Sequence, residues 1–173
     1  MADSEKVLHE KMIRFLKRYF YVFSEVWSDD KTSRIDLVIL HHSDKERKYP
    51  IGIEIKVKEK KTGRSLADWL RQAIRYTENT FKGFGKCLII TCPQISGYYL
   101  KEGSEMHQHE DEKGCREDHN ASTFLGQFKI GEFQKYIGKF DKQYMRIVYK
   151  GSIIWDMKDN ILRMHNYERL CKW

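Results

Sequence analysis

The chain has few of the residues that interrupt or crosslink a fold. Its 173 residues include only two prolines, Pro50 and Pro93, and no low-complexity linker or internal repeat is visible. The regular elements should therefore lie close together, in one domain over residues 1–173. The four cysteines are Cys87, Cys92, Cys115 and Cys171. They form neither a C-x-x-C pair nor a recognisable disulfide framework, so reduced thiols are expected.

Long hydrophobic runs are also missing. The longest apolar stretches, residues 35–40 around Asp36 and residues 87–90, are far shorter than the roughly 20 residues that span a bilayer. The first residues hold no basic segment followed by an apolar core, so no secretory signal is expected. These absences predict an intracellular, cytoplasmic protein without a membrane partner.

Positive charge is in excess, with 32 Lys+Arg against 25 Asp+Glu and a formal net charge of +7. With 40% hydrophobic and 13% aromatic residues, the chain is too apolar for wholesale disorder. A basic surplus suits a polyanionic partner, because phosphate backbones and anionic lipids are both attracted to it. Net charge alone does not choose between these partners.

Hydrophobic periodicity in the first half predicts the element order α-β-β-β-α-β. The predicted elements are a helix from Asp3 or Ser4 to about Arg18, strands over Tyr21–Trp27, Ser33–His41 and Pro50–Lys58, a helix from Ser65 to about Phe81, and a strand over Lys86–Cys92. That last strand is almost continuously apolar, which is typical of a central strand covered on both faces. The prediction is an α/β fold with a catalytic core over residues 1–100.

The second half is less regular. Residues 101–122 are polar and indicate a loop or insertion, and residues 123–173 indicate a β-rich C-terminal extension. The predicted elements of the extension are a strand over Phe124–Ile130, a short helix over Glu132–Lys139, a hairpin of Tyr144–Tyr149 and Ser152–Met157 around Lys150-Gly151, and a final helix or irregular tail to Trp173.

Three charged residues on neighbouring strands form the most informative pattern. Side chains alternate along a strand, so Glu54 and Lys56 share one face. If the second and third strands form an antiparallel hairpin centred on Lys45, opposed residues have numbers that sum to 90, and Asp36 faces Glu54. Adjacent carboxylates destabilise a sheet unless something compensates. Mg²⁺ would compensate, since it prefers one or two carboxylates with further oxygens, such as the Ile55 carbonyl.

A lysine beside such a cation has a chemical use. Lys56 could orient or deprotonate a water molecule and stabilise the charge that develops on a phosphate, which are the requirements of phosphodiester hydrolysis. The alternative is a surface hairpin on which Glu54 and Lys56 are ordinary charge partners and Asp36 is an edge residue. E-x-K triplets are common, so this alternative stays open on the triplet alone.

The order of elements and motifs resembles the PD-(D/E)xK nuclease superfamily, which has the restriction-endonuclease-like fold, a mixed central sheet flanked by helices. The resemblance covers about Glu5 to Cys92, although Ile35 stands where the family pattern has proline. The matching segments are Arg34-Ile35-Asp36-Leu37-Val38, Ile53-Glu54-Ile55-Lys56-Val57 and, similar to the Q-x-x-x-Y motif of RecB-type members, Gln72-Ala73-Ile74-Arg75-Tyr76.

The resemblance implies a role for each matched residue and a cofactor. Asp36 and Glu54 would be catalytic metal ligands for Mg²⁺ or Mn²⁺, and Lys56 would be the catalytic lysine. The first-helix acid of many members would be Glu5, with Glu10 as the alternative. Gln72 and Tyr76 would contact the substrate or orient the site. The partner would be DNA, cut by an exonuclease or by an endonuclease, which in this fold often acts as a homodimer. No iron–sulfur cluster of the kind some RecB-type members hold is predicted, since the cysteines are scattered.

A basic run follows the acidic pair directly. The run consists of Lys56, Lys58, Lys60, Lys61 and Arg64. It could bind the phosphates that flank the scissile bond, or it could be a solvated loop.

Two other functions compete with the nuclease prediction. One is a nucleic-acid-binding module of the same fold without turnover, which the intact Asp36, Glu54 and Lys56 disfavour. The other is an interaction protein stabilised by zinc, which imidazole and thiolate groups can bind, although the segment is equally an acidic solvated loop. Its candidate ligands are His107, His109, Cys115 and His119.

Overall fold

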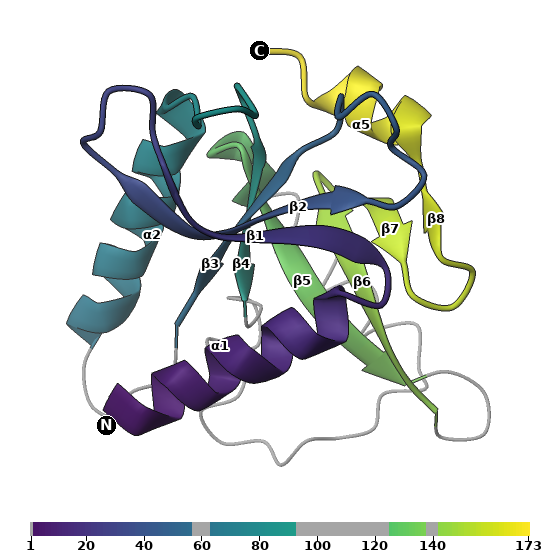
Figure 1. Cartoon of the computed structure of the whole chain (residues 1–173), viewed down its shortest axis with the longest axis horizontal. Helices are drawn as coiled ribbons and strands as arrows, with labels where there is room; N and C mark the ends of the chain where they lie inside the picture. The colour runs from purple at the N-terminus through teal and green to yellow at the C-terminus, as the bar shows by residue number, and fades with distance from the viewer. Residues whose placement is uncertain (1, 57–62, 93–124, 138–141) are drawn as a thin grey trace.

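One mixed sheet of eight strands forms the centre of the computed structural model (Figure 1). The structure describes residues 2–56, 63–92, 125–137 and 142–173, with the backbone alone at 2–5, 63–67 and 137. The strands are β1 (Phe20–Trp27), β2 (Arg34–His41), β3 (Ile51–Ile55), β4 (Leu88–Cys92), β5 (Ile130–Ile137), β6 (Gln143–Tyr149), β7 (Ser152–Asp156) and β8 (Ile161–Leu162). The longer helices are α1 (Ala2–Leu16), α2 (Gly63–Glu78) and α5 (Met164–Leu170).

The strands lie in the sheet in their sequence order, and the direction of pairing changes twice. β1, β2 and β3 form an antiparallel meander, β3 pairs in parallel with β4 across α2, and β4 pairs in parallel with β5. The remaining strands, β5 to β8, are antiparallel. The chain is therefore α/β, as predicted, with the order α-β-β-β-α-β in its first half.

Alternating side chains give the sheet two covered faces. On one face, Met12 and Leu16 of α1 pack in a core cluster with Ile53 and Ile90. On the other face, Ala73 of α2 packs in a second cluster with Val38, Ile89 and Ile130. All residues of β4 are buried, which confirms the central position predicted for this strand.

Two predictions for the second half were wrong. The segment predicted as a short helix over Glu132–Lys139 belongs to β5, and the segment predicted as a strand over Phe124–Ile130 contains a helical turn at residues 125–127 before β5 begins. Phe133, Tyr136 and Ile137 suit the period of a helix, but pairing with β4 and β6 on either side makes the segment a strand. Tertiary pairing overrides local preference here.

Helix α2 also differs from its prediction at both ends. It begins at Gly63, so Ser65 lies inside the helix and is not its cap. It ends at Glu78, where the Lys86 ammonium donates to the carbonyl oxygens of Thr77 and Glu78 at 3.2 and 2.6 Å. Phe81, the predicted end, forms bridges to Ser28 and Gly85 instead.

The predicted β6–β7 hairpin is confirmed, and of the two alternatives left for the C-terminal segment, a helix or an irregular tail, the structure has the helix α5. Lys150 and Gly151 both have positive φ, 49° and 73°, as a type I′ turn requires. Helix α5 returns to the sheet, where the Tyr167 hydroxyl donates to the Pro50 carbonyl at 2.6 Å. Among the described residues, no helix is long and apolar enough to cross a membrane.

Candidate functional site

The β2–β3 hairpin places Asp36 opposite Glu54. The ladder pairs Leu37 with Ile53, Val38 with Gly52 and Ile39 with Ile51. Each pair sums to 90, so the register predicted from the sequence is confirmed. Asp36 and Glu54 lie one step beyond the last of these pairs.

The β2–β3 ladder ends at Leu37 and Ile53, while β3 stays paired with β4 through Ile55. The Ile55 amide donates to Asp36 Oδ2 at 2.7 Å. The next amide, that of Lys56, donates to the Cys92 carbonyl on β4 at 3.0 Å. The Asp36 carboxylate is therefore held at the point where the two strands part.

Glu54 is buried without the hydrogen bonds that a buried carboxylate requires. The residue is 1% exposed, and neither carboxylate oxygen receives a hydrogen bond from the described part of the chain. Lys56 Nζ lies 3.4 Å from Glu54 Oε1. Burial, followed by the charge of Asp36, raises the pKa of Glu54 to about 8, while Lys56 acts in the opposite direction. A buried carboxylate with so few hydrogen bonds is costly, and Lys56 is the cation that offsets part of this cost.

The donor set suits a hard divalent cation. Carboxylate oxygens with backbone oxygens and water are the ligands that Mg²⁺ and Mn²⁺ prefer. The described ranges contain no group of three or more His, Cys, Asp or Glu side chains that could hold a metal ion. A cation here would therefore rely on Asp36 and Glu54, with oxygens such as the Ile55 carbonyl and water completing its shell.

Gln72 and Tyr76 of α2 form a hydrogen-bonded chain that reaches the start of β2. Gln72 Nε2 donates to the Tyr76 hydroxyl at 2.6 Å, and that hydroxyl donates to the Arg34 carbonyl at 2.7 Å. Burial and, second, the charge of Glu54 raise the pKa of Tyr76 to about 12, so the phenol lies near the acids. Because Tyr76 is 3% exposed, this geometry favours orientation of the site over contact with a substrate.

Comparisons with protein-family models, curated proteins and solved structures find no match to this chain. The chemistry of Asp36, Glu54 and Lys56 is therefore the basis for any functional proposal.

Several predicted site residues lie outside the described side chains. Glu5 belongs to α1 and Arg64 to α2, but only their backbones are described. Glu10, the alternative acid, is exposed. The roles of these residues stay predictions, as do those of the residues outside the described ranges: Lys58, Lys60, Lys61, His107, His109, Cys115 and His119.

The sequence analysis missed two polar residues that continue the row of Glu54 across the sheet. Thr91 pairs with Glu54, and Glu132 pairs with Thr91, so the three share one sheet face. Both are 0% exposed. Thr91 Oγ1 has no hydrogen-bond partner among the described residues, while Glu132 Oε2 accepts from Gln134 Nε2 at 3.2 Å. Reading β5 as a strand with alternating polar residues would have found Glu132.

Proposed function

We propose that this chain is a Mg²⁺- or Mn²⁺-dependent nuclease that hydrolyses DNA phosphodiester bonds with a PD-(D/E)xK site. The observation that carries the proposal is Glu54, a buried carboxylate without hydrogen bonds from the described residues, facing Asp36 and lying 3.4 Å from the Lys56 ammonium. Two acids and a lysine in this relation are what metal-assisted phosphoryl transfer to water requires.

The topology supports the proposed restriction-endonuclease-like core. The resemblance implies the order helix, strand, acid-bearing strand, strand with the E-x-K triplet, helix and strand, in a mixed central sheet flanked by helices. The chain has this order in α1, β1 to β3, α2 and β4, with Asp36 on β2 and Glu54 on β3. Strands β5 to β8 widen the sheet beyond that core.

Asp36 and Glu54 would hold the cation, which when bound would supply Lewis-acid stabilisation of charge on a phosphate. The protein's own contribution is to fix the ligands in advance. The Ile55 amide orients the Asp36 carboxylate, and Tyr76 anchors the β2 backbone two residues before it. Such supporting contacts set the geometry of a metal site as much as its ligands do.

Lys56 is placed to act on water and substrate. Its side chain is 36% exposed while its ammonium remains 3.4 Å from Glu54 Oε1. The ammonium can hydrogen-bond to a water molecule or to a phosphate oxygen at the edge of the buried pair. It would stabilise the negative charge that grows as the phosphodiester bond breaks.

The test incubates linear, circular, single-stranded and branched DNA with the protein and Mg²⁺ or Mn²⁺. Asp36→Ala and Lys56→Ala should lose cleavage, whereas the exposed Asp29→Ala and Lys172→Ala serve as matched controls and should retain it. Cleavage that survives both site substitutions would refute the site.

The same experiment separates the nuclease from the binding module. Absence of cleavage on every substrate, with retention of labelled DNA in a filter-binding assay, would favour a nucleic-acid-binding module that keeps this fold without turnover.

A further inference from the structure

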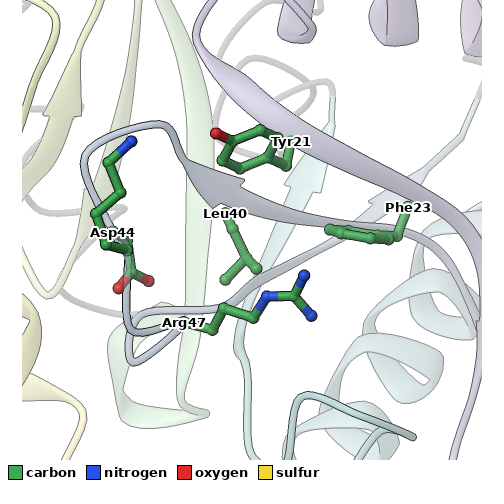
Figure 2. A pocket seen from close by; sticks show the side chains of 6 residues that line it. Tyr21, Phe23, Leu40, Asp44 and Arg47 are labelled. Atoms are coloured by element: carbon green, nitrogen blue, oxygen red, sulfur yellow. The ribbon is translucent and has the colours of Figure 1, made fainter.

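A hollow of about 230 Å³ lies between β1, β2 and the loop that joins β2 to β3 (Figure 2). It is lined by Tyr21, Phe23, Leu40, Asp44, Lys45 and Arg47. Pockets for drug-sized ligands run from roughly 300 to 1,000 Å³, so this hollow suits a smaller group.

Aromatic rings form one side of the hollow and are held in place by neighbours. Tyr21 is 49% exposed, and its ring lies edge-on to the His42 ring with centroids 4.8 Å apart. The Phe23 ring packs edge-on against Phe84, with centroids 4.9 Å apart. Their orientation is therefore set before any ligand arrives, and the half-exposed Tyr21 ring is open to contact from solvent.

Two cations also line the hollow. Lys45 and Arg47 are exposed, and the Arg47 guanidinium lies 6.0 Å from the centroid of the Phe23 ring. The one acid of the lining, Asp44, is 4% exposed. Its two carboxylate oxygens accept the amides of Lys48 and Tyr49 at 3.0 and 2.8 Å. The carboxylate is turned into the loop, so the hollow offers rings and positive charge.

We infer that this hollow binds an unpaired nucleotide of single-stranded DNA, with the base stacked on Tyr21 and the phosphate contacted by Lys45 and Arg47. Every base has a π-face, and aromatic rings beside a cationic rim are the recurring means of holding single strands without sequence readout. DNA as the partner rests on the proposed function. The choice of an unpaired base over a duplex rests on the exposed ring.

The hollow lies on the sheet face that carries Glu54. Tyr21 pairs with Leu40, Phe23 pairs with Val38, and Val38 pairs with Gly52, two residues before Glu54 on β3. Leu40 is four residues from Asp36 along β2, a distance of about 13 Å at ~3.3 Å per residue. A few nucleotides would cover that separation. The hollow and the proposed cleavage site therefore share a sheet face, with the buried Val38 and the helix α2 that covers it lying between them.

The test measures the anisotropy of a fluorescently labelled oligothymidylate in EDTA, so that cleavage contributes nothing. Tyr21→Ala should weaken binding by about 5- to 150-fold, the range for loss of one stacked base. Arg47→Ala should weaken binding and reduce the salt dependence by about one phosphate contact. Tyr21→Phe should keep the affinity, because it keeps the ring. Trp173→Ala and Lys172→Ala, an exposed aromatic residue and an exposed cation outside the hollow, are matched controls.

Two outcomes would overturn the inference. One is an unchanged affinity for the oligothymidylate in both Tyr21→Ala and Arg47→Ala. The other is tighter binding of a duplex of the same length than of the single strand, with a ratio of affinities that Tyr21→Ala does not alter. Arg47 is exposed, so its substitution keeps the test decisive even if Tyr21→Ala fails to fold. If Tyr21→Ala and Arg47→Ala weaken DNA binding but no DNA is cleaved with Mg²⁺ or Mn²⁺, the proposed hollow is supported and the proposed nuclease activity is refuted. If DNA is cleaved but neither substitution changes binding, the nuclease activity is supported and the hollow is refuted.

Discussion

Two buried acids lie on the same hairpin and differ in how they are satisfied. Asp44, in the loop between β2 and β3, is 4% exposed and accepts two backbone amides. Glu54, at the other end of β3, is 1% exposed, and its oxygens accept no hydrogen bond within the described residues. Asp44 stabilises a turn in the way that buried charges usually do. Glu54 instead lies 3.4 Å from the Lys56 ammonium and accepts no backbone amide of the described residues.

The largest expected effect is the loss of DNA cleavage when Glu54, but not Asp44, is substituted. Glu54→Gln should lower the rate of metal-dependent DNA cleavage by about 10²- to 10³-fold or more, because a group that stabilises transition-state charge is lost. Its thermal midpoint in EDTA should equal or exceed that of the parent, because burial already disfavours the charged form of Glu54 and an amide of the same shape carries no charge. A Glu54→Gln protein with lower stability and full cleavage would reverse our assignment.

The opposite pattern is expected at the loop. Asp44→Ala leaves two backbone amides without their acceptor and should cost about 2 to 4 kcal/mol of unfolding free energy, measured by urea titration. Cleavage per folded molecule at saturating DNA should stay close to that of the parent, because Asp44 lies in the loop and not beside Glu54. Asp29→Ala, at an exposed acid, is the control for the loss of charge. If Asp44→Ala unfolds at the parental urea concentration, the contrast between the two acids fails.

An intermediate effect is expected at Tyr76, which orients the site and is buried. Tyr76→Phe removes the donor to the Arg34 carbonyl and should cost about 0.5 to 1.5 kcal/mol of stability. Because Tyr76 positions the site, Tyr76→Phe should lower kcat of DNA cleavage by about 10- to 100-fold with little change in KM. A change confined to KM would show that Tyr76 contacts the substrate instead.

The smallest effect is a pH dependence at the loop end of β2. Asn160 Oδ1 accepts from Trp155 Nε1 at 3.1 Å and lies 2.9 Å from His41 Nε2, so that nitrogen carries the proton. His41 Nδ1 then accepts the Ser43 amide at 3.2 Å, and the ring is neutral. Burial lowers the pKa of His41 below its ordinary 6.5.

Because the folded pKa of His41 is depressed, its contribution is present above pH 6.5 and is lost as pH falls below that value. Thermal midpoints measured from about pH 7 down to about pH 5 should therefore decline, and His41→Gln should flatten that decline. An identical slope in the variant would assign the decline to other groups.

The sequence predicted the structure best where side chains alternate strictly along a strand and a short loop joins that strand to its neighbour. Alternation along β3 put Glu54 and Lys56 on one face, and the loop centre at Lys45 predicted the register that places Asp36 opposite Glu54. It failed at Glu132, because β5 is a strand through its partners on either side and not through its own period.

The hollow beside Tyr21 could not be predicted from the sequence, because it also depends on contacts between separate segments. Tyr21 and Phe23 were correctly predicted to lie in a strand, but a strand pattern does not tell which residues another segment covers. The loop that joins β2 to β3 brings Lys45 and Arg47 to the same hollow as Tyr21, Phe23 and Leu40 (Figure 2).

The sequence by itself determined which charges lie on the hairpin and that they share a face, because a period of two and a hairpin register are local properties. Only the tertiary structure decided that Glu54 is buried without a hydrogen-bond partner among the described residues, while Asp44 is fully satisfied. Burial and hydrogen bonding depend on segments distant in sequence, here β4 and α2 beside Glu54. The free energy of a buried carboxylate is set by these neighbours and not by the residue itself.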